Sequence, residues 1–310
     1  MRIVFFGTPP VAAKILSSLF ETEHEIVAVI SRPDKPKGRS KKLAPTAVKE
    51  YVQLHHPETP LYQPTKVSSE ESISLIRSFD PDLFVVVAYG AILKQNLLDV
   101  PKLLPINIHF SLLPKYRGAA PMQRSIMAGE KETGVTFMAM DAGMDTGDIL
   151  RVEKIPLGEN QTLQELELAL TKLSRATFPK FLQDLEAGKI ERHAQKHEHA
   201  THAAKIEKED CEIDFSKPAE QVHNQIRALS PQPGAYTRVE TQGKLLRLKI
   251  FRTQVIDQTG SPGQVTSYTP DELIISCGEK SLQILDLQLE GKKPMRASDF
   301  VRGQQKFIIL

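Results

Sequence analysis

Asn107 and His109 stand two residues apart near the end of the apolar segment 103–110, with the letters LLPINIHF. An amide N–H can hold a developing oxyanion, and an imidazole can polarise a carbonyl group or move a proton near neutral pH. A histidine in an apolar segment is also a common core residue, so the pair alone leaves a structural role open. Chemistry at this strand end would require a third group.

Asp145 is the candidate for that third group. It lies in the segment 141–148 between two apolar segments, and Gly143 and Gly147 would let this loop bend back over a neighbouring strand end. A carboxylate there could orient the imidazole, stabilise its cation or accept a proton from an amine. An amide, an imidazole and a carboxylate together suit acyl transfer to an amine. No Ser–His–Asp nucleophile pattern is present, because Ser111 lacks a glycine-rich elbow.

The elements that would position these residues alternate between strand and helix in the first 189 residues. Apolar runs predict strands over 2–6, 25–31, 81–90, 103–110, 133–140 and 148–157. Helical spacing of apolar residues predicts helices over 9–21, 44–55, 70–79, 120–130 and 162–188. This alternation indicates an α/β fold with a doubly wound, Rossmann-like, mostly parallel sheet. Ligands of such sheets bind beyond the carboxyl ends of the strands, where Asn107 and His109 are expected.

The sequence changes in character near residue 190. We interpret 1–189 as a catalytic domain and 190–207, which is polar and lacks apolar periodicity, as a linker. Residues 208–310 are interpreted as a second domain, a C-terminal OB-like β-barrel. It would comprise a helix over about 219–229 and strands over 234–240, 244–256, 263–269, 272–278 and 281–289.

Two further motifs favour structural interpretations. The turn GTPP at 7–10 lacks the remaining glycines of a dinucleotide fingerprint, which argues against a nicotinamide-dependent dehydrogenase. Histidines crowd the linker, but no cysteine or carboxylate completes a metal site there, so we expect no metal. Cys211 and Cys277 are far apart and lack zinc spacing, as expected of reduced thiols. The linker histidines are His193, His197, His199 and His202.

Bulk composition is that of an ordinary globular protein, with 310 residues, 40% hydrophobic content and a net charge of +2. The longest apolar run, 83–93, is shorter than the roughly 20 residues of a membrane helix, and the amino-terminal apolar stretch is too short for a signal peptide. We therefore expect a cytoplasmic protein without membrane contact. The segment 31–42 carries six cations and one carboxylate, a net charge of +5. It is either a solvated loop or an arm that contacts phosphates.

The segments NIHFSLLPKYRGAAP and GVTFMAMDAGMDTGDIL together resemble the folate-dependent formyltransferases. The resemblance implies that Asn107, His109 and Asp145 are the catalytic triad. It also implies a metal-independent reaction with 10-formyltetrahydrofolate as formyl donor. The folate-binding loop of the family is matched by Ser111, Leu112, Leu113 and Pro114.

Four segments are similar to the members of this family that formylate methionine on initiator tRNA: 31–49, 118–138, 203–237 and 287–303. This similarity implies initiator methionyl-tRNA and folate as partners of a monomer, with Arg39 as the key residue of a wedge into the acceptor stem. Lys37, Lys41 and Lys42 would lie beside it. The barrel would contact the tRNA backbone, with candidates Lys205, Lys208, Lys244, Arg247, Lys249, Lys292, Lys293 and Arg296. The alternatives are a formyltransferase acting on an amino sugar, which would not need the basic loop, and an inactive tRNA-binding protein.

Overall fold

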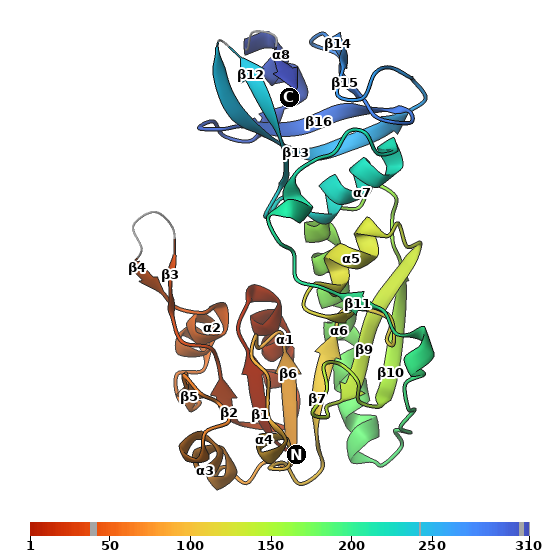
Figure 1. Cartoon of the computed structure of the whole chain (residues 1–310). Coiled ribbons are helices and arrows are strands. Elements are labelled where there is room, and N and C mark those ends of the chain that lie inside the picture. The colour runs from red at the N-terminus through yellow and green to blue at the C-terminus, as the bar shows by residue number, and fades with distance from the viewer. Residues whose placement is uncertain (38–41, 242, 304–306, 310) are drawn as a thin grey trace. The chain divides into compact units, whose positions relative to one another are not determined.

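The computed structural model describes residues 1–37, 42–241, 243–303 and 307–309 (Figure 1). Contacts between Cα atoms divide the chain into two units. The first unit comprises Met1–Arg117, Gly134–Lys154 and Ala169–His202, and the second comprises Gly118–Thr133, Ile155–Leu168 and Ala203–Leu310. All residues of the predicted triad therefore belong to the first unit.

The sheet that carries the predicted triad has the strand order β10-β9-β7-β6-β1-β2-β5. Strands β1, β2, β5, β6 and β7 pair in parallel, whereas β9 runs antiparallel to β7. In chain order the strands are β1 (Arg2–Gly7), β2 (Glu25–Ile30), β5 (Leu61–Tyr62), β6 (Leu83–Val87), β7 (Leu104–His109), β9 (Glu132–Ala139) and β10 (Ile149–Pro156). The order reverses direction between β1 and β6, which makes their carboxyl ends the topological switch point of the sheet.

Helices cover both faces of this sheet, as in other doubly wound folds. Val4, Phe6 and Phe84 on one face pack in a cluster with residues of α3 and α4, while α1 contacts β1, β2 and β6. Phe137 of β9 stacks on Phe181 of α6 at a centroid distance of 4.7 Å. The helices are α1 (Pro10–Phe20), α2 (Ala47–His55), α3 (Glu70–Ser78), α4 (Gln95–Leu98), α5 (Pro121–Met127) and α6 (Leu163–Glu186).

Helix boundaries follow from capping groups in the sequence. Thr46 caps α2, because its side chain accepts a hydrogen bond from the backbone N–H of Lys49. The side chain of Ser69 caps α3 by accepting a hydrogen bond from the backbone N–H of Ser72. Helix α1 starts with Pro10, whose fixed φ and missing N–H suit the first turn. The long helix predicted over 162–188 is confirmed as α6, which ends two residues before Gly188.

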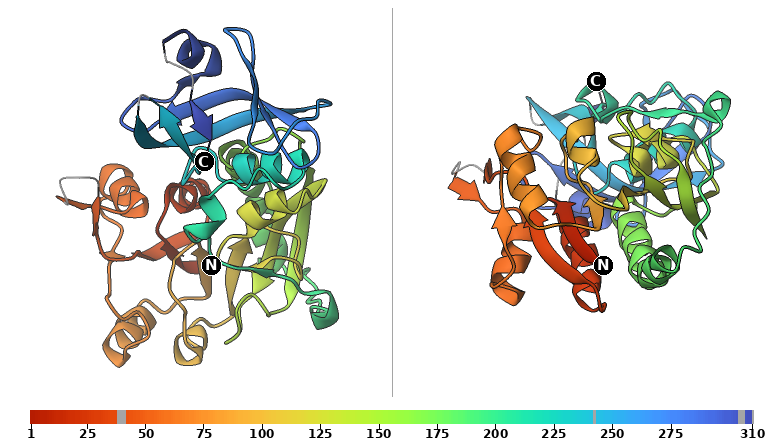
Figure 2. Two further views of the ribbon diagram at one scale, coloured as in Figure 1. Left: turned by 45° about the horizontal axis from the view of Figure 1, so that its top comes forward. Right: turned by 90° about the horizontal axis from the view of Figure 1, so that it is seen from below.

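Segment 31–42, predicted as a loop, contributes to a small antiparallel hairpin. Its strands are β3 (Lys35–Lys37) and β4 (Lys42–Ala44), with Lys35 opposite Ala44 and Lys37 opposite Lys42. The hairpin projects from the first unit (Figure 1 and Figure 2). A second short pair joins β8 (Arg117–Gly118) to β11 (His202–Ala203).

The carboxy-terminal sheet has the order β14-β15-β16-β13-β12-β18, and β17 pairs with β16. Its pairings are antiparallel, and helix α7 packs Val222 and Ile226 into the same core. The predicted fold class, a Rossmann-like sheet followed by an OB-like barrel, is confirmed. The elements are α7 (Ala219–Ala228), β12 (Ala235–Thr241), β13 (Lys244–Ile256), β14 (Val265–Tyr268), β15 (Leu273–Ser276), β16 (Ser281–Leu289), β17 (Met295–Arg296), α8 (Ala297–Gly303) and β18 (Ile308–Ile309).

Sequence patterns missed short elements, because two to seven residues are too few to show periodicity. These elements are β5, β8, β11, β17, β18, α4 and α8. The linker contains one 3-10 turn, His197–His199. A second 3-10 turn, Glu209–Cys211, follows the linker. Among the helices of the described ranges, none combines the length and apolar character that crossing a membrane requires.

Candidate active site

Strand alternation places Asn107 and His109 on one face of β7. Ile106 and Ile108 are 0% and 2% exposed and fill the core on the opposite face, because successive side chains of a strand point to opposite sides. Asn107 lies opposite Val86 of β6 and Met138 of β9, and His109 lies opposite Thr136. Both polar side chains therefore emerge together at the carboxyl end of β7, as the sequence predicted.

The loop between β9 and β10 brings Asp145 to the same place. Asp141 closes this loop through its Oδ1, which accepts hydrogen bonds from the Gly143 N–H at 3.0 Å and the Thr146 hydroxyl at 2.6 Å. A Cβ on Gly147 would lie 2.0 Å from the Ala139 carbonyl oxygen, so this close return over β9 requires glycine. Asp145 itself has a φ of 54°, a left-handed conformation that aspartate tolerates better than most residues.

The three predicted triad residues meet in the structure. Asp145 Oδ1 lies 3.4 Å from Asn107 Nδ2, and Asp145 Oδ2 lies 3.6 Å from His109 Nδ1. The His109 side chain is 5% exposed and the Asp145 side chain 16% exposed, so most solvent is excluded from the pair. One carboxylate thus faces both the amide and the imidazole.

The tautomer of His109 follows from its second ring nitrogen. His109 Nε2 lies 2.9 Å from the backbone oxygen of Tyr116. A carbonyl oxygen can only accept, so Nε2 must carry the proton when this hydrogen bond forms. In the neutral ring, Nδ1 is then the basic nitrogen, and it is the one that faces Asp145.

A buried glutamine and arginine hold the backbone of the Asp145 loop. Gln195 Nε2 donates to the carbonyl oxygens of Asp145 at 2.9 Å and Gly147 at 2.7 Å. Gln195 Oε1 accepts from Arg117 Nε at 3.0 Å and Nη2 at 2.7 Å, and Arg117 Nη1 donates to His197 Nδ1 at 3.1 Å. Gln195 and Arg117 are 6% and 5% exposed. Sequence reasoning missed Gln195, since a lone glutamine in a polar linker carries no signal.

The predicted folate loop, Ser111 to Pro114, is fastened to the neighbouring strand β9. Thr136 Oγ1 donates to the Ser111 carbonyl at 2.7 Å and accepts from the Leu113 N–H at 3.2 Å. The Ser111 hydroxyl is buried and donates to the Lys115 carbonyl at 2.8 Å. A Cβ on Gly134 would lie 2.6 Å from Leu112 Cδ2, so glycine on β9 leaves the space that Leu112 fills.

A cavity of about 160 Å³ opens beside Asp145. Apolar side chains line it, including Ile92, Leu93, Met138 and Met140, together with the loop 141–145. The segment 111–114 does not line this cavity. Ile92, Leu93, Met138 and Met140 line this cavity, and the sequence analysis missed them, because the apolar residues of a site cannot be distinguished in the sequence from those of a core strand.

The basic hairpin is only partly described. Arg39 and Lys41 lie outside the described residues, and for Lys37 and Lys42 the structure gives the strand positions only. The one carboxylate of the segment, Asp34, is occupied by Lys49 Nζ at 2.7 Å and Gln63 Nε2 at 2.6 Å. These hydrogen bonds, the one from Lys49 first, lower the pKa of the Asp34 carboxyl. The hydrogen bonds that Asp34 accepts from Lys49 and Gln63 therefore come from residues outside the segment 31–42.

Several candidate cations of the barrel make local contacts within the second unit. Lys249 Nζ donates to the Pro233 carbonyl at 2.6 Å, and Arg296 pairs with Asp286 at 3.2 Å. Arg247 lies over the Tyr236 ring at 4.9 Å, and Lys205 pairs with Glu207 at 3.8 Å. These contacts do not distinguish a tRNA-binding face from an ordinary charged surface.

Two of the linker histidines make contacts within the first unit. His197 accepts from Arg117, and His193 pairs through its backbone with Ile149 of β10. Within the part of the chain that the structure describes, no group of three or more histidine, cysteine or carboxylate side chains could hold a metal ion.

Comparisons with known proteins match the chain along most of its length. Residues 1–182 match the family described as "Formyl transferase", and residues 205–305 match "Formyl transferase, C-terminal domain". A methionyl-tRNA formyltransferase of Protochlamydia amoebophila is 45% identical over 99% of this chain and 96% of its own length. The enzyme of Geobacter sulfurreducens is 44% identical over 98% of this chain and 94% of its own length. The enzyme of Chlamydia muridarum is 42% identical over 100% of this chain and 98% of its own length.

Solved structures agree on the fold. A sugar 3N-formyl transferase, WlaRD, aligns with a TM-score of 0.67 at 20% identity and covers 94% of this chain and 99% of that one. The HypX protein of Aquifex aeolicus in complex with tetrahydrofolic acid aligns with a TM-score of 0.65 at 18% identity. The alignment covers 97% of this chain and 47% of the HypX chain. Both family segments and the full-length relatives lead to one conclusion: this chain belongs to the formyl transferase family.

Proposed function

We propose that the chain is a methionyl-tRNA formyltransferase, which transfers the formyl group of 10-formyltetrahydrofolate to the α-amino group of methionine on initiator tRNA. The observation that carries the proposal is the meeting of Asn107, His109 and Asp145 at one strand end, beside an apolar cavity. The relatives that bear this enzyme name support the choice of acceptor, because they match this chain at 42% to 45% identity over nearly its whole length.

The reaction forms a bond between the amine nitrogen and the formyl carbon and breaks the bond between that carbon and N10 of the folate. One proton leaves the amine, and N10 of the released tetrahydrofolate gains one. The amine must arrive neutral, since an ammonium group has no lone pair. Asn107 Nδ2 can donate to the oxyanion that develops on the formyl oxygen, and the buried position of the site strengthens this interaction.

His109 and Asp145 would handle charge and protons. Nδ1 of His109 faces the Asp145 carboxylate at 3.6 Å, so the carboxylate can hold the imidazole in its orientation. The imidazole held in this way can stabilise the oxyanion, while Asp145 assists removal of the amine proton. The Gln195 and Arg117 network keeps the Asp145 backbone in position for these roles.

The cavity beside Asp145 would hold the pterin ring of the folate. Its walls are apolar at Ile92, Leu93 and Met140, as expected of a site for a ring system, and the 141–145 loop completes the lining. Ser111, Leu112, Leu113 and Pro114 would form the adjoining wall of the donor site. Their hydrogen bonds to Thr136 of β9 keep that wall rigid next to His109.

The remaining segments would bind the tRNA. We assign residues 1–189 to a catalytic domain, 190–207 to a linker and 208–310 to a tRNA-binding barrel that contacts the phosphate backbone. Arg39, with Lys37, Lys41 and Lys42, would act at the acceptor end from the β3–β4 hairpin. We place the enzyme in the cytoplasm as a monomer, where charged initiator tRNA is its substrate.

Formyl transfer to three acceptors tests the proposal: methionine charged on initiator tRNA, methionine charged on elongator tRNA, and a free nucleotide-linked amino sugar. We expect the initiator substrate to be formylated with a kcat/KM far above that of the other two. Transfer to the amino sugar alone would identify the enzyme as a sugar formyltransferase instead. No transfer to any acceptor would contradict the proposal.

A further inference from the structure

The backbone oxygen that lies 2.9 Å from His109 Nε2 belongs to Tyr116, whose φ is 61°. This left-handed conformation is uncommon for a residue with a bulky side chain, and it persists only where the surrounding contacts hold it. Relaxing φ to a negative value would rotate the peptide group between Lys115 and Tyr116. The allowed regions at negative φ also have a different ψ, and ψ sets the direction of the Tyr116 carbonyl group. The contacts that prevent this relaxation therefore determine what His109 Nε2 faces.

The peptide group between Lys115 and Tyr116 is held at both ends by hydroxyl groups. Ser111 Oγ donates to the Lys115 carbonyl oxygen at 2.8 Å, and this serine is 0% exposed. At the other end, the Tyr116 N–H donates to Thr201 Oγ1 at 2.9 Å. Rotation of this peptide group would break both hydrogen bonds, so the two hydroxyl groups stabilise the left-handed conformation of Tyr116.

The next peptide group, between Tyr116 and Arg117, is held at both ends as well. Its carbonyl oxygen faces His109 Nε2, and its N–H donates to the Thr201 carbonyl oxygen at 2.9 Å. Thr201 thus accepts from two consecutive N–H groups, one through its side chain and one through its backbone. It does so from the linker, 85 residues further along the chain than Tyr116. All of these contacts lie within the first unit, which includes Ala169–His202.

Two acceptors compete for the proton of the neutral His109 ring. The Tyr116 oxygen lies at an ordinary hydrogen-bond distance from Nε2, whereas Asp145 Oδ2 is 3.6 Å from Nδ1. A carboxylate is the stronger acceptor of the two, so a Tyr116 carbonyl group turned away from the ring would leave the proton on Nδ1. Nδ1 would then donate to the carboxylate that is to assist removal of the amine proton. The direction of one backbone carbonyl group therefore decides the tautomer.

We propose that Thr201 is a positioning residue of the triad, which fixes the Tyr116 carbonyl group and thereby keeps the His109 proton on Nε2. Thr201 acts through the backbone of Tyr116, and Ser111 holds the same backbone from the other end. The inference rests on the proposed function for its effect on turnover, because His109 acts in that reaction. The tautomer itself is a property of the free protein and can be measured without any substrate.

Nuclear magnetic resonance of the full chain, with isotope-labelled histidine nitrogens, tests the inference directly. The chemical shifts of the two ring nitrogens show which of them carries the proton, and the spectrum of His109→Gln identifies the His109 signals. Spectra recorded over a range of pH select the neutral ring. We expect the wild type to carry its proton on Nε2. A wild type with the proton on Nδ1 would overturn the inference before any variant is made.

Thr201→Val keeps the size of the side chain but removes the acceptor for the Tyr116 N–H. The residue is exposed, so the variant should fold. The ratio of the two tautomers should shift toward Nδ1 by about three- to tenfold, the effect of one hydrogen bond. Thr201→Ser keeps the hydroxyl and should restore the wild-type ratio, and Thr65→Val, at an exposed position of the same unit, should not change it. An unchanged ratio in Thr201→Val, or no recovery in Thr201→Ser, would refute the role of the hydroxyl.

Turnover then connects the tautomer to the reaction. Thr201→Val should lower kcat by about the same factor as the tautomer ratio and leave the KM values for charged tRNA and folate unchanged. A lower kcat with an unaltered tautomer ratio would mean that Thr201 has a structural role only, against the inference. A wild type whose Nε2 tautomer depends on Thr201 but which formylates no acceptor would contradict the proposed function and support this inference.

Discussion

Gln195 holds Asp145 from a position 50 residues away in the chain, by donating to its carbonyl oxygen at 2.9 Å. The same amide group donates to the Gly147 carbonyl at 2.7 Å, so it spans the turn that presents the carboxylate. Gln195 is in turn fixed by two hydrogen bonds from the buried Arg117. The left-handed backbone of Asp145 is thus maintained by a side chain that lies outside the sheet and its loops.

Replacing Gln195 with alanine should slow formyl transfer without abolishing tRNA binding. The change removes the partner of two carbonyl groups and of the Nε and Nη2 groups of the buried Arg117, at a cost of about 1–3 kcal/mol in stability. A shift of Asp145 by about 1 Å can lower kcat on the order of 100-fold. Steady-state kinetics would show the fall in kcat with a nearly constant KM for tRNA. Lys196→Ala, at an exposed neighbour, is the control and should change neither value; an equal loss there would refute a specific role for Gln195.

Asp145→Asn should lower kcat by roughly two to four orders of magnitude. The amide keeps the shape of the side chain but carries no negative charge and cannot accept the amine proton. Single-turnover formylation would measure the chemical step, and the affinities for charged tRNA and folate should stay close to those of the wild type. Asp99→Asn removes an exposed carboxylate from the same unit and serves as control. Near-normal single-turnover rates in Asp145→Asn would show that the carboxylate has no catalytic part.

Gly147→Ala should impair both stability and turnover. The added Cβ would stand 2.0 Å from the Ala139 carbonyl oxygen, a backbone atom that cannot turn aside. Such overpacking costs about 1–3 kcal/mol and would displace the loop that carries Asp145. Gly158→Ala is the matched control, since its Cβ would meet Gln161 Cβ at an ordinary 3.5 Å. Gly147→Ala should have a lower melting temperature and a lower kcat than Gly158→Ala. Equal values for the two variants would argue against a tight turn at Gly147.

His223 should make the protein less stable as pH falls below about 6.5. Its Nδ1 lies 2.8 Å from Thr253 Oγ1 and its Nε2 lies 3.0 Å from the Glu159 carbonyl oxygen, an arrangement suited to the neutral ring. Burial is the largest cause and lowers the pKa of His223; the hydrogen bond to the Glu159 backbone opposes it, Arg227 adds to the lowering, and the charges of Glu159 and Glu220 raise the pKa less. The unfolded chain therefore binds this proton more readily than the folded chain does.

The neutral His223 contributes its full stability at pH values above the pKa that it has in the unfolded chain. This contribution is lost as pH falls toward the pKa of His223 in the folded chain, which is lower. One such group can change the free energy of unfolding by at most about 1.4 kcal/mol per pH unit. Melting temperatures recorded from pH 8 to pH 5.5 should fall more steeply for the wild type than for His223→Gln. Identical slopes for the two proteins would contradict this prediction.

Both cysteine thiols should be unreactive in the folded protein. Burial raises the pKa of Cys277 to about 12 and also raises that of Cys211, with Glu220 and Asp210 adding to the respective shifts. The reactive thiolate is therefore scarce near pH 8, and both sulfur atoms lie in the second unit's core. Labelling with a thiol reagent should reach both residues only in denaturant; rapid labelling of the native chain would show that one of them is exposed.

Much of the site could be predicted because it follows from local patterns. Buried Ile106 and Ile108 alternate with Asn107 and His109, so strand periodicity alone places the amide and the imidazole on one face. Glycines on both sides of Asp145 indicated a loop that returns to its strand. The capping residues Thr46 and Ser69 and the apolar spacing of α1 and α6 likewise determined helices from neighbouring residues only.

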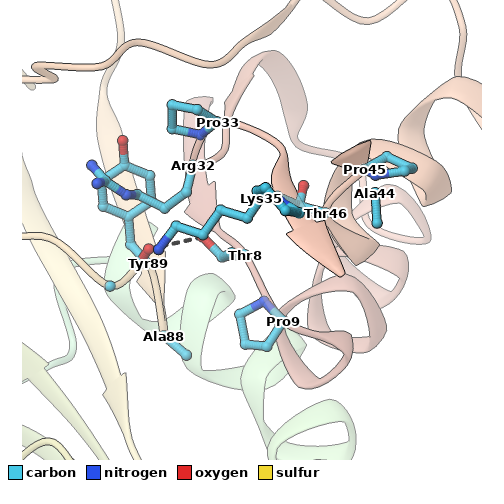
Figure 3. Close-up of a pocket in the computed structure, with 12 residues that line it drawn as sticks. Thr8, Pro9, Arg32, Pro33, Lys35, Ala44, Pro45, Thr46, Ala88 and Tyr89 are labelled. Atoms are coloured by element: carbon cyan, nitrogen blue, oxygen red, sulfur yellow. Dashed lines mark hydrogen bonds between the residues drawn. The ribbon is translucent and has the colours of Figure 1, made fainter. Parts of the chain in front are cut away.

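Only the tertiary structure decided which distant groups complete the site. Gln195 reaches Asp145 from another segment and is held there by Arg117, and Arg32 and Tyr89 come together from the ends of β2 and β6 (Figure 3). Periodicity indicates which face of a strand or helix a residue occupies. A hydrogen bond between distant segments also depends on strand order and register, and the same periodic pattern is compatible with several orders and registers. The residues of the triad were therefore readable from the sequence, whereas the network and the cavity that surround them were decided by packing.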